Sequence, residues 1–312
     1  MKQKVLVSID VEAPIGANGV NFLIYGRIGN DYYGIDYLMD IFDENGIKGL
    51  FFVDVCEAWE YERDVFLKMM RHIDSRGHDV GVHVHPDRMA DKNRRFLWQY
   101  NYEEQYDIIK KATDLYIEAL DKKPISFRAG RYGANDDTID ILNKLGYKID
   151  MSYFYGKKNC RITSFNGHNK VQVINGILEV PVTSFVSFSF LKYMKYEKTD
   201  SGLHFKEHKF YLKKLYGNID VISFFAHSFS LLKWRAKPND PSFSKKLDKR
   251  FQKNLSLYLD SNAFVFITEK DLLSFDETHD SDKRIVFKGI RPFFFFVRTC
   301  FQNIINRLIN NV

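Results

Sequence analysis

The chain has 312 residues, enough for one large α/β domain or two ordinary ones. Apolar residues make up 45% and charged residues 28%, a globular composition that excludes a disordered or fibrous chain. The formal net charge of +6 equals the six cations of residues 283–312, which contain no acid, so the neutral remainder shows no nucleic-acid footprint.

The compartment is suggested by the cysteines and by the N-terminus. Cys56, Cys160 and Cys300 lie far apart and form neither a disulfide framework nor a CxxC metal pair, which favours a reducing environment. The first apolar run begins at Val5 and is too short for a signal peptide, and no apolar stretch reaches the length of a membrane span. We therefore expect a cytoplasmic protein.

Apolar runs typical of buried strands alternate along the chain with amphipathic segments typical of helices. The pattern predicts strands over 4–10, 48–55, 79–85, 125–129 and 147–152, separated in turn by helices over 35–46, 60–76, 102–120 and 136–145. Residues 161–188 predict short strands and turns, followed by a helix over 206–216, a strand over 220–226, a helix over 243–261 and a strand over 263–268.

Strands that alternate with helices favour parallel strands joined by crossover helices, so we expect an α/β fold with about seven parallel strands in a complete or partial (β/α) barrel. Such barrels carry catalytic groups at the C-terminal ends of their strands. Polar residues occupy that position in five strands: Asp10 with Glu12, His83 with His85, Arg128, Asp150, and His227. A barrel would bring all five groups to one mouth.

The two histidines suggest a metal site. His83 and His85 are two apart on a strand and therefore share a face, as do Asp10 and Glu12. Two imidazoles and a carboxylate form a three-ligand site whose open position activates a water for attack on a carbonyl. One acid would bind the metal and the other would accept the proton of the water. Asp87, four residues after His83, is a further ligand candidate, and ordinary polar residues near a loop are the alternative.

The remaining polar groups have both catalytic and structural interpretations. Arg128 would hold a carboxylate ionised through a bidentate pair, or form a structural salt bridge. Gly130 and Gly133 allow a tight loop whose N–H groups face an oxyanion, or serve turn geometry alone. His227 would protonate a leaving nitrogen, oriented by Asp150, or be a satisfied core histidine.

Five segments, in order, resemble the motifs of the polysaccharide deacetylase family, also called the NodB-homology or carbohydrate esterase four family. The segments are Ser8–Glu12 (SIDVE), Gly77–His83 (GHDVGVH), Phe127–Gly133 (FRAGRYG), Gly146–Ser152 (GYKIDMS) and Ser223–Ser228 (SFFAHS). The resemblance spans residues 5 to 275 and implies a distorted, incomplete (β/α) barrel that removes acetyl or formyl groups from amino sugars with a divalent metal, Zn first and Co or Ni as alternatives.

The resemblance also implies roles for individual residues. Asp10 would be the catalytic base, held by Arg128. Glu12 and His83 would bind the metal, and the backbone N–H of Tyr132 would contribute to an oxyanion hole. His227 would be the general acid, supported by Asp150.

Two departures from the family pattern affect the metal ligands. Position 11 is Val where most members carry a second Asp, and Asp87 stands where the second histidine is usual. The other metal ligand would therefore be His85 or Asp87. The DVE and HVHP forms look most like members from bacterial surface-polysaccharide or lipopolysaccharide biosynthesis, which would make the substrate a nucleotide- or lipid-linked sugar.

Residues 283–312 form a basic tail that we separate from a catalytic barrel of residues 1–282. Val297, Phe301, Ile304, Ile305 and Leu308 recur at helical spacing, and Arg298 and Arg307 lie toward the other side. This pattern predicts a helix that lies on an anionic membrane through residues 291–309, which would place the protein at the inner face of the membrane. A terminal helix packed on the barrel is the alternative.

Three functional hypotheses remain. The first is a metal-dependent sugar N-deacylase. The second is a binding protein for a glycan or lipid carrier that kept the fold and lost the metal, suggested by Val11 and the altered histidine spacing. The third is a barrel amidohydrolase acting on a small amide, although HxH pairs in such enzymes typically lie on the first strand.

Overall fold

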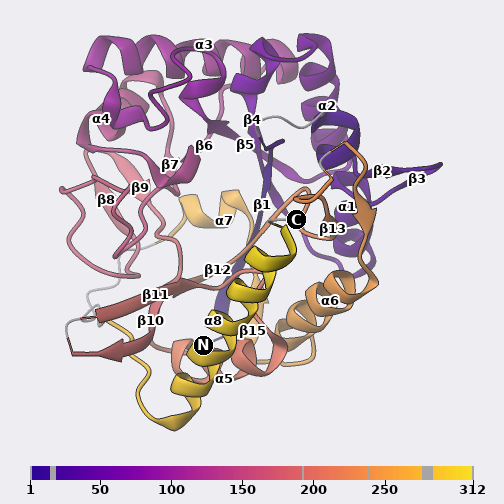
Figure 1. Ribbon diagram of the computed structural model, residues 1–312. Coiled ribbons are helices and arrows are strands. Elements are labelled where there is room, and N and C mark those ends of the chain that lie inside the picture. The colour runs from indigo at the N-terminus through magenta and orange to yellow at the C-terminus, as the bar shows by residue number, and fades with distance from the viewer. Residues whose placement is uncertain (1, 15–18, 192, 238, 276–283, 311–312) are drawn as a thin grey trace.

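The computed structural model describes residues 2–14, 19–191, 193–237, 239–275 and 284–310. Within these ranges one nine-stranded sheet forms the centre of the protein (Figure 1). Its strands, in spatial order, are β12 (Val221–His227), β1 (Gln3–Val11), β4 (Leu50–Asp54), β5 (Asp79–Val84), β6 (Ser126–Ala129), β7 (Ile149–Asp150), β9 (Ile177–Glu179) and β8 (Gln172–Ile174), with β15 (Phe264–Phe266) also paired to β1.

The sheet curves into the predicted incomplete (β/α) barrel. Every pairing in it is parallel except that of β8 with β9. Along one edge of β1, β15 pairs with its first residues and β4 with its last, so these two strands diverge. Between β9 and β12, side chains bridge the barrel: Thr183 Oγ1 accepts from the backbone N–H of Ser223 at 2.8 Å. The predicted fold class is confirmed.

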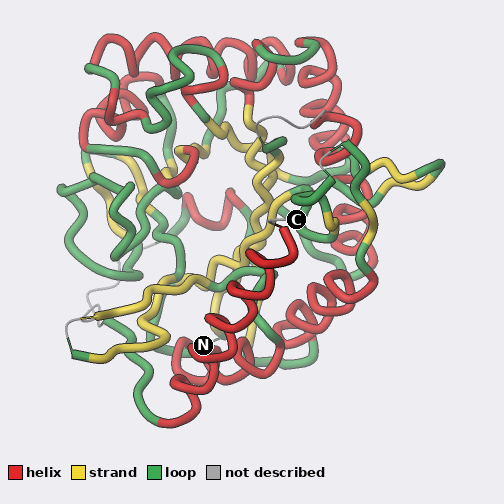
Figure 2. The backbone as a smooth tube through the Cα atoms, viewed as in Figure 1, coloured by secondary structure: helices red, strands yellow, loops and turns green. Residues whose placement is uncertain are grey.

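Helices cover the outside of the strands (Figure 2). They are α1 (Ile35–Glu44), α2 (Arg63–Ser75), α3 (Tyr102–Leu120), α4 (Asp136–Leu145), α5 (Phe205–Leu215) and α6 (Lys245–Leu259). Capping boxes fix two of their starts, because Asn101 accepts from the N–H of Glu104 and Asn135 from that of Thr138. The short α7 (Glu269–Leu273) lies at the end of the barrel where the strands begin, and the N–H of Glu269 donates to Asp79 at the start of β5.

The core has two layers. The larger fills the space between strands and helices, and the smaller fills the barrel interior, with Leu6, Leu50, Phe52, Ile149 and Met151 among its members. Because apolar side chains fill the interior, a polar site has to lie at an end of the barrel.

The structure also contains elements that the sequence pattern did not predict. The hairpins are β2 (Arg27–Ile28) with β3 (Asp31–Tyr32), β10 (Ser184–Phe190) with β11 (Tyr193–Lys198), and β13 (Leu232–Lys233) with β14 (Ser242–Phe243). Short helical turns cover Val20–Ile24, Val55–Trp59, Pro86–Arg88, Leu97–Gln99 and Gly130–Tyr132. The turn at Val55–Trp59 occupies the chain between β4 and α2, so α2 begins at Arg63 rather than at residue 60.

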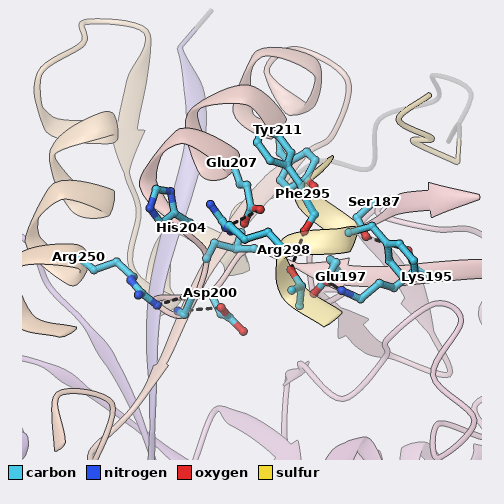
Figure 3. A pocket seen from close by; sticks show the side chains of 14 residues that line it. Ser187, Lys195, Glu197, Asp200, His204, Glu207, Tyr211, Arg250, Phe295 and Arg298 are labelled. Atoms are coloured by element: carbon cyan, nitrogen blue, oxygen red, sulfur yellow. Dashed lines mark hydrogen bonds and ion pairs between the residues drawn. The ribbon is translucent and has the colours of Figure 1, made fainter. Parts of the chain in front are cut away.

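The C-terminal helix α8 (Ile290–Asn310) packs on α5 and on the β10–β11 hairpin. Phe296 stacks on Phe188 with ring centres 4.2 Å apart. Arg298, expected on a solvated basic face, instead pairs with Glu207 of α5 at 2.6 Å, at the edge of a polar pocket of about 290 Å³ (Figure 3). Ile285 is buried too, so the folded body continues past residue 282 and the division at 282/283 remains a proposal about function.

Candidate metal centre

Three ligand atoms converge at the mouth of the barrel. Glu12 directly follows β1, while His83 lies on β5 and His85 just after it. Glu12 Oε2 lies 2.7 Å from His85 Nε2 and 3.5 Å from His83 Nε2, and the two Nε2 atoms are 3.2 Å apart. Among the described residues, these three form the one cluster of His, Cys, Asp or Glu with metal-ligand spacing.

The distances fit a divalent cation. Four donors at about 2.0–2.1 Å from a tetrahedral ion stand about 3.3–3.4 Å from one another. The separations of 3.2 and 3.5 Å are close to this value, and the 2.7 Å between Glu12 and His85 is shorter. Two imidazoles and one carboxylate are the ligand set of many hydrolytic zinc sites and leave further positions open. Burial raises the pKa of Glu12, but the neighbouring His85 and His83 lower it well below its usual range, so the carboxylate is ionised as a ligand requires.

Neighbouring groups fix the orientation of both histidines. His83 Nδ1 lies 2.8 Å from the carbonyl oxygen of Arg128 and donates to it, which directs Nε2 at the site. His85 packs flat against Gly130, where an added Cβ would lie 2.6 Å from the imidazole carbons. The glycine of the FRAGRYG segment is therefore required by contact with a ligand side chain.

Asp10 lies beside the three ligands and is paired with an arginine. Arg128 Nη1 donates to Asp10 Oδ1 at 2.5 Å, and its Nη2 donates to Ser8 Oγ at 3.0 Å. Although burial raises the pKa of Asp10, Arg128 and then His83 lower it below its usual range. Burial also lowers the pKa of His83, but the negative charges of Asp10 and Glu12 raise it to about 9.

His227 ends β12 on the other side of Glu12. Its Nε2 lies 3.5 Å from Glu12 Oε1, and its ring stacks on Phe229. Burial lowers the pKa of His227 to about 4, outweighing the opposite effect of Glu12 and Asp10. The histidine is therefore neutral at neutral pH before a substrate binds.

Asp150 does not reach His227, which corrects the predicted pairing. Neighbouring residues of a strand point to opposite faces, and Met151 points into the barrel, where its sulfur lies 3.9 Å from Arg128 Nη2. Asp150 therefore points outward, accepts from Ser152 Oγ at 2.6 Å and lies beside Glu179. Burial raises the pKa of both carboxyl groups.

Asp87 also lies apart from the ligand cluster. It is buried and forms a bidentate pair with Arg131, at 2.8 and 3.1 Å, because the turn Pro86–Arg88 directs it away from the histidines. The geometry thus favours His85 over Asp87 as the third ligand.

Tyr132 lies in the loop after β6, next to the site. Arg131 and Tyr132 adopt left-handed φ angles of 54° and 62°, which non-glycine residues rarely do outside functional loops. The Tyr132 hydroxyl accepts from Lys198 Nζ at 2.7 Å. The loop therefore holds Tyr132 at the barrel mouth, where the family resemblance expects its N–H.

Buried groups that the sequence did not reveal support the ligands from behind. Asp54 accepts from the backbone N–H of His85 at 3.3 Å. Glu57 accepts from the N–H of Ala13 at 2.7 Å, while Arg88 donates to the carbonyl of Ala13 and pairs with Glu57. Both backbone polar atoms of Ala13, the residue next to Glu12, are thus held. The only sequence signal was an acid at the end of the second strand, and buried partners of backbone atoms leave no spacing to recognise.

Comparison with known proteins relates the fold and part of the sequence to a family. Residues 32–149 match the family model of polysaccharide deacetylase, and no curated protein sequence matches the chain. A solved structure assigned as a polysaccharide deacetylase from Mycobacterium smegmatis is 15% identical, with 90% of this chain and 95% of that chain covered and a TM-score of 0.58.

Two further solved structures are more distant. A CE4 family pseudoenzyme from Bacillus anthracis is 12% identical, covers 92% of this chain and 70% of its own, and has a TM-score of 0.47. The catalytic domain of a peptidoglycan N-acetylglucosamine deacetylase from Eubacterium rectale is 10% identical, with 91% and 95% covered and a TM-score of 0.46. Residues 32–149 match the polysaccharide deacetylase family model and the fold is shared with a solved structure of that description, which confirms the resemblance that the motifs predicted.

Proposed function

We propose that this chain is a divalent-metal-dependent hydrolase that removes an N-acyl group, acetyl or formyl, from an amino sugar. The observation that carries the proposal is the convergence of Glu12, His83 and His85 beside the Asp10–Arg128 pair. Nitrogen and carboxylate donors in this number favour Zn, with Co or Ni as alternatives. A cation held there would supply Lewis acidity toward both a water and the amide carbonyl.

The side chains around the ligands would manage the protons. Asp10, kept ionised by Arg128, accepts a proton from the attacking water. The N–H of Tyr132 donates to the developing oxyanion. That negative charge raises the pKa of His227, which then takes up a proton from solvent and delivers it to the leaving amine, while the proton on Asp10 returns to solvent. Water and amide thereby become a carboxylic acid and a free amine.

The test is release of acetate or formate from N-acylated amino sugars by purified, metal-loaded protein. Asp10→Asn should lower the rate by about 10²–10⁴-fold, the usual contribution of an acid–base group. Asp79→Asn is the matched control, because Asp79 is a partly buried carboxylate at the opposite end of β5.

Two results would separate the alternative functions. Absence of turnover with retained glycan binding would favour the non-catalytic binder, and turnover of small amides alone would favour the amidohydrolase.

We propose further that the substrate is a sugar made for a bacterial surface polysaccharide or lipopolysaccharide, nucleotide- or lipid-linked, and met in the cytoplasm. This part rests on the DVE and HVHP forms of the motifs. None of the helices in the described part of the chain is long and apolar enough to cross a membrane.

Contact with a membrane surface is the last part of the proposal, and an exposed face of α8 supports it. Its exposed apolar side chains are Phe293, Phe294, Val297, Phe301 and Ile304. These positions fall within about 100° of the helix circumference, so they form one face, opposite to the side that packs on α5. The neighbouring hairpin adds Phe190 and Leu191, which are 65% and 90% exposed. The side chains at Ile305, Arg307 and Leu308 lie outside the described residues.

Co-sedimentation with anionic vesicles tests this contact. Because Ile285 and Phe287 are buried in the body, point variants are cleaner than a truncation after residue 282. Phe294→Ser with Phe301→Ser should abolish pelleting that the wild type shows, whereas Tyr32→Ser, at another exposed aromatic, should not. Equal behaviour of all three proteins would remove the membrane from the proposal.

A further inference from the structure

A cavity opens directly beside the metal centre. It has a volume of about 230 Å³ and is lined by Glu12, Ala13, Pro14, His85, Arg88, Arg95 and Arg131. Glu12 and His85 belong both to the cavity and to the ligand cluster. A substrate whose amide lies at the metal centre would therefore extend a neighbouring substituent into this cavity.

The charges of the cavity do not cancel. Asp87 is buried between two guanidinium groups, paired with Arg131 at 2.8 Å and with Arg95 Nε at 3.9 Å. One carboxylate thus serves two cations, and one positive charge is left over. Arg88 adds none, because it is itself paired with Glu57 and Glu60. Glu12 is directed at the histidines, and a bound divalent cation would more than offset its charge.

Arg95 is the group best placed to use that charge. Its side chain is 55% exposed, and Asp87, reached only through Nε, is its single ion-pair or hydrogen-bond partner among the residues that the structure describes. The terminal nitrogens remain for a ligand. Arginine presents them in a planar fork that matches two oxygens of a carboxylate or phosphate.

The backbone of Arg131, the second arginine beside Asp87, adopts an unfavourable conformation. Arg131 holds a φ of 54°, a conformation that costs an L-residue free energy and is usually given to glycine. The side chain at this position carries Asp87 and lines the cavity.

We infer that this cavity is a subsite for an anionic group on the sugar, a phosphate ester or a carboxylate, bound by Arg95 with Arg131 beside it. The inference deepens the proposed function and rests on it. A neutral N-acyl sugar would need no cation at this position, so the subsite selects for a charged substrate.

The test compares three sugars that share one acetamido group: N-acetylglucosamine 1-phosphate, N-acetylglucosaminuronic acid and methyl N-acetylglucosaminide. Metal-loaded wild type, Arg95→Met and Arg27→Met are assayed for kcat/KM and for binding by calorimetry. Arg27 is an exposed arginine on the β2–β3 hairpin, which projects away from the barrel in Figure 1, so its variant controls for the loss of one charge.

Arg95→Met should lower kcat/KM for one or both anionic sugars about tenfold or more, mainly through KM, and leave the neutral sugar unchanged. The arm that responds identifies phosphate or carboxylate. Equal use of charged and neutral sugars by the wild type, or an equal loss for both in Arg95→Met, would overturn the subsite and leave the proposed function intact. Binding of the anionic sugars that depends on Arg95, without hydrolysis of any sugar, would overturn the proposed function and keep the subsite.

Discussion

Gly130→Ala should weaken metal binding without unfolding the protein. Gly130 has no positive φ, so alanine can adopt its backbone. The new Cβ, however, would lie 2.6 Å from two carbons of the His85 ring. Carbon atoms in contact prefer about 3.5–4.0 Å, so the ring must move by about 1 Å. Metal–ligand distances tolerate only about 0.2 Å.

The expected loss is about 10–100-fold in metal affinity, the range seen when the support of a ligand is removed. That corresponds to about 1.4–2.8 kcal/mol of binding free energy. Zn affinity is measured by competition with a chromophoric chelator, and folding by circular dichroism.

Gly217→Ala is the matched control, because an added Cβ there meets nothing within 4 Å. Its positive φ of 68° predicts a small loss of stability with unchanged metal affinity. Wild-type affinity in folded Gly130→Ala would refute the packing argument.

Other substitutions test the surroundings of the site and the core. Arg128→Met should lower the free energy of unfolding by about 3–5 kcal/mol in urea titrations, because it removes the guanidinium paired with the buried Asp10 carboxylate, and adding Asp10→Asn should restore part of it; an additive loss would contradict this. Glu57→Ala should weaken Zn binding about tenfold, whereas Glu57→Gln still accepts from the N–H of Ala13 and should stay near wild type, so equal effects would exclude the support. His208, whose pKa burial lowers to about 3, gains its proton on unfolding, so stability should fall by about 1.4 kcal/mol per pH unit below pH 6.5. His208→Gln should lack this component between pH 6.5 and 5, and identical slopes would refute it.

The strand and helix pattern could be predicted because each element carries its own signal. The helices at Tyr102–Leu120 and Asp136–Leu145 begin and end at the predicted residues, since an asparagine cap and a hydrophobic period mark them locally. The β10–β11 hairpin and its contact with α8 carry no such signal. They depend on packing between distant aromatic side chains such as Phe188 and Phe296.

The candidate site was predictable where a residue lies on a strand end and points to a known face. His83 and Glu12 share such positions, and the barrel brings them together. The orientation of Asp150 was not predictable, because the fourth motif fixes its place in sequence and not the face of the strand. Asp54 and Glu57 were not predicted, because they accept hydrogen bonds from backbone N–H groups of residues far away in the sequence.

We expect Glu12, His83 and His85 to hold one divalent cation. The direct measurement is the metal content of protein exchanged into Zn, determined by mass spectrometry for wild type and for alanine variants of the three residues. We expect one ion per wild-type chain, loss of that ion in each alanine variant, and retention in Asp87→Asn and Asp79→Asn. Retention of the ion in His85→Ala with loss in Asp87→Asn would contradict this assignment of the ligands.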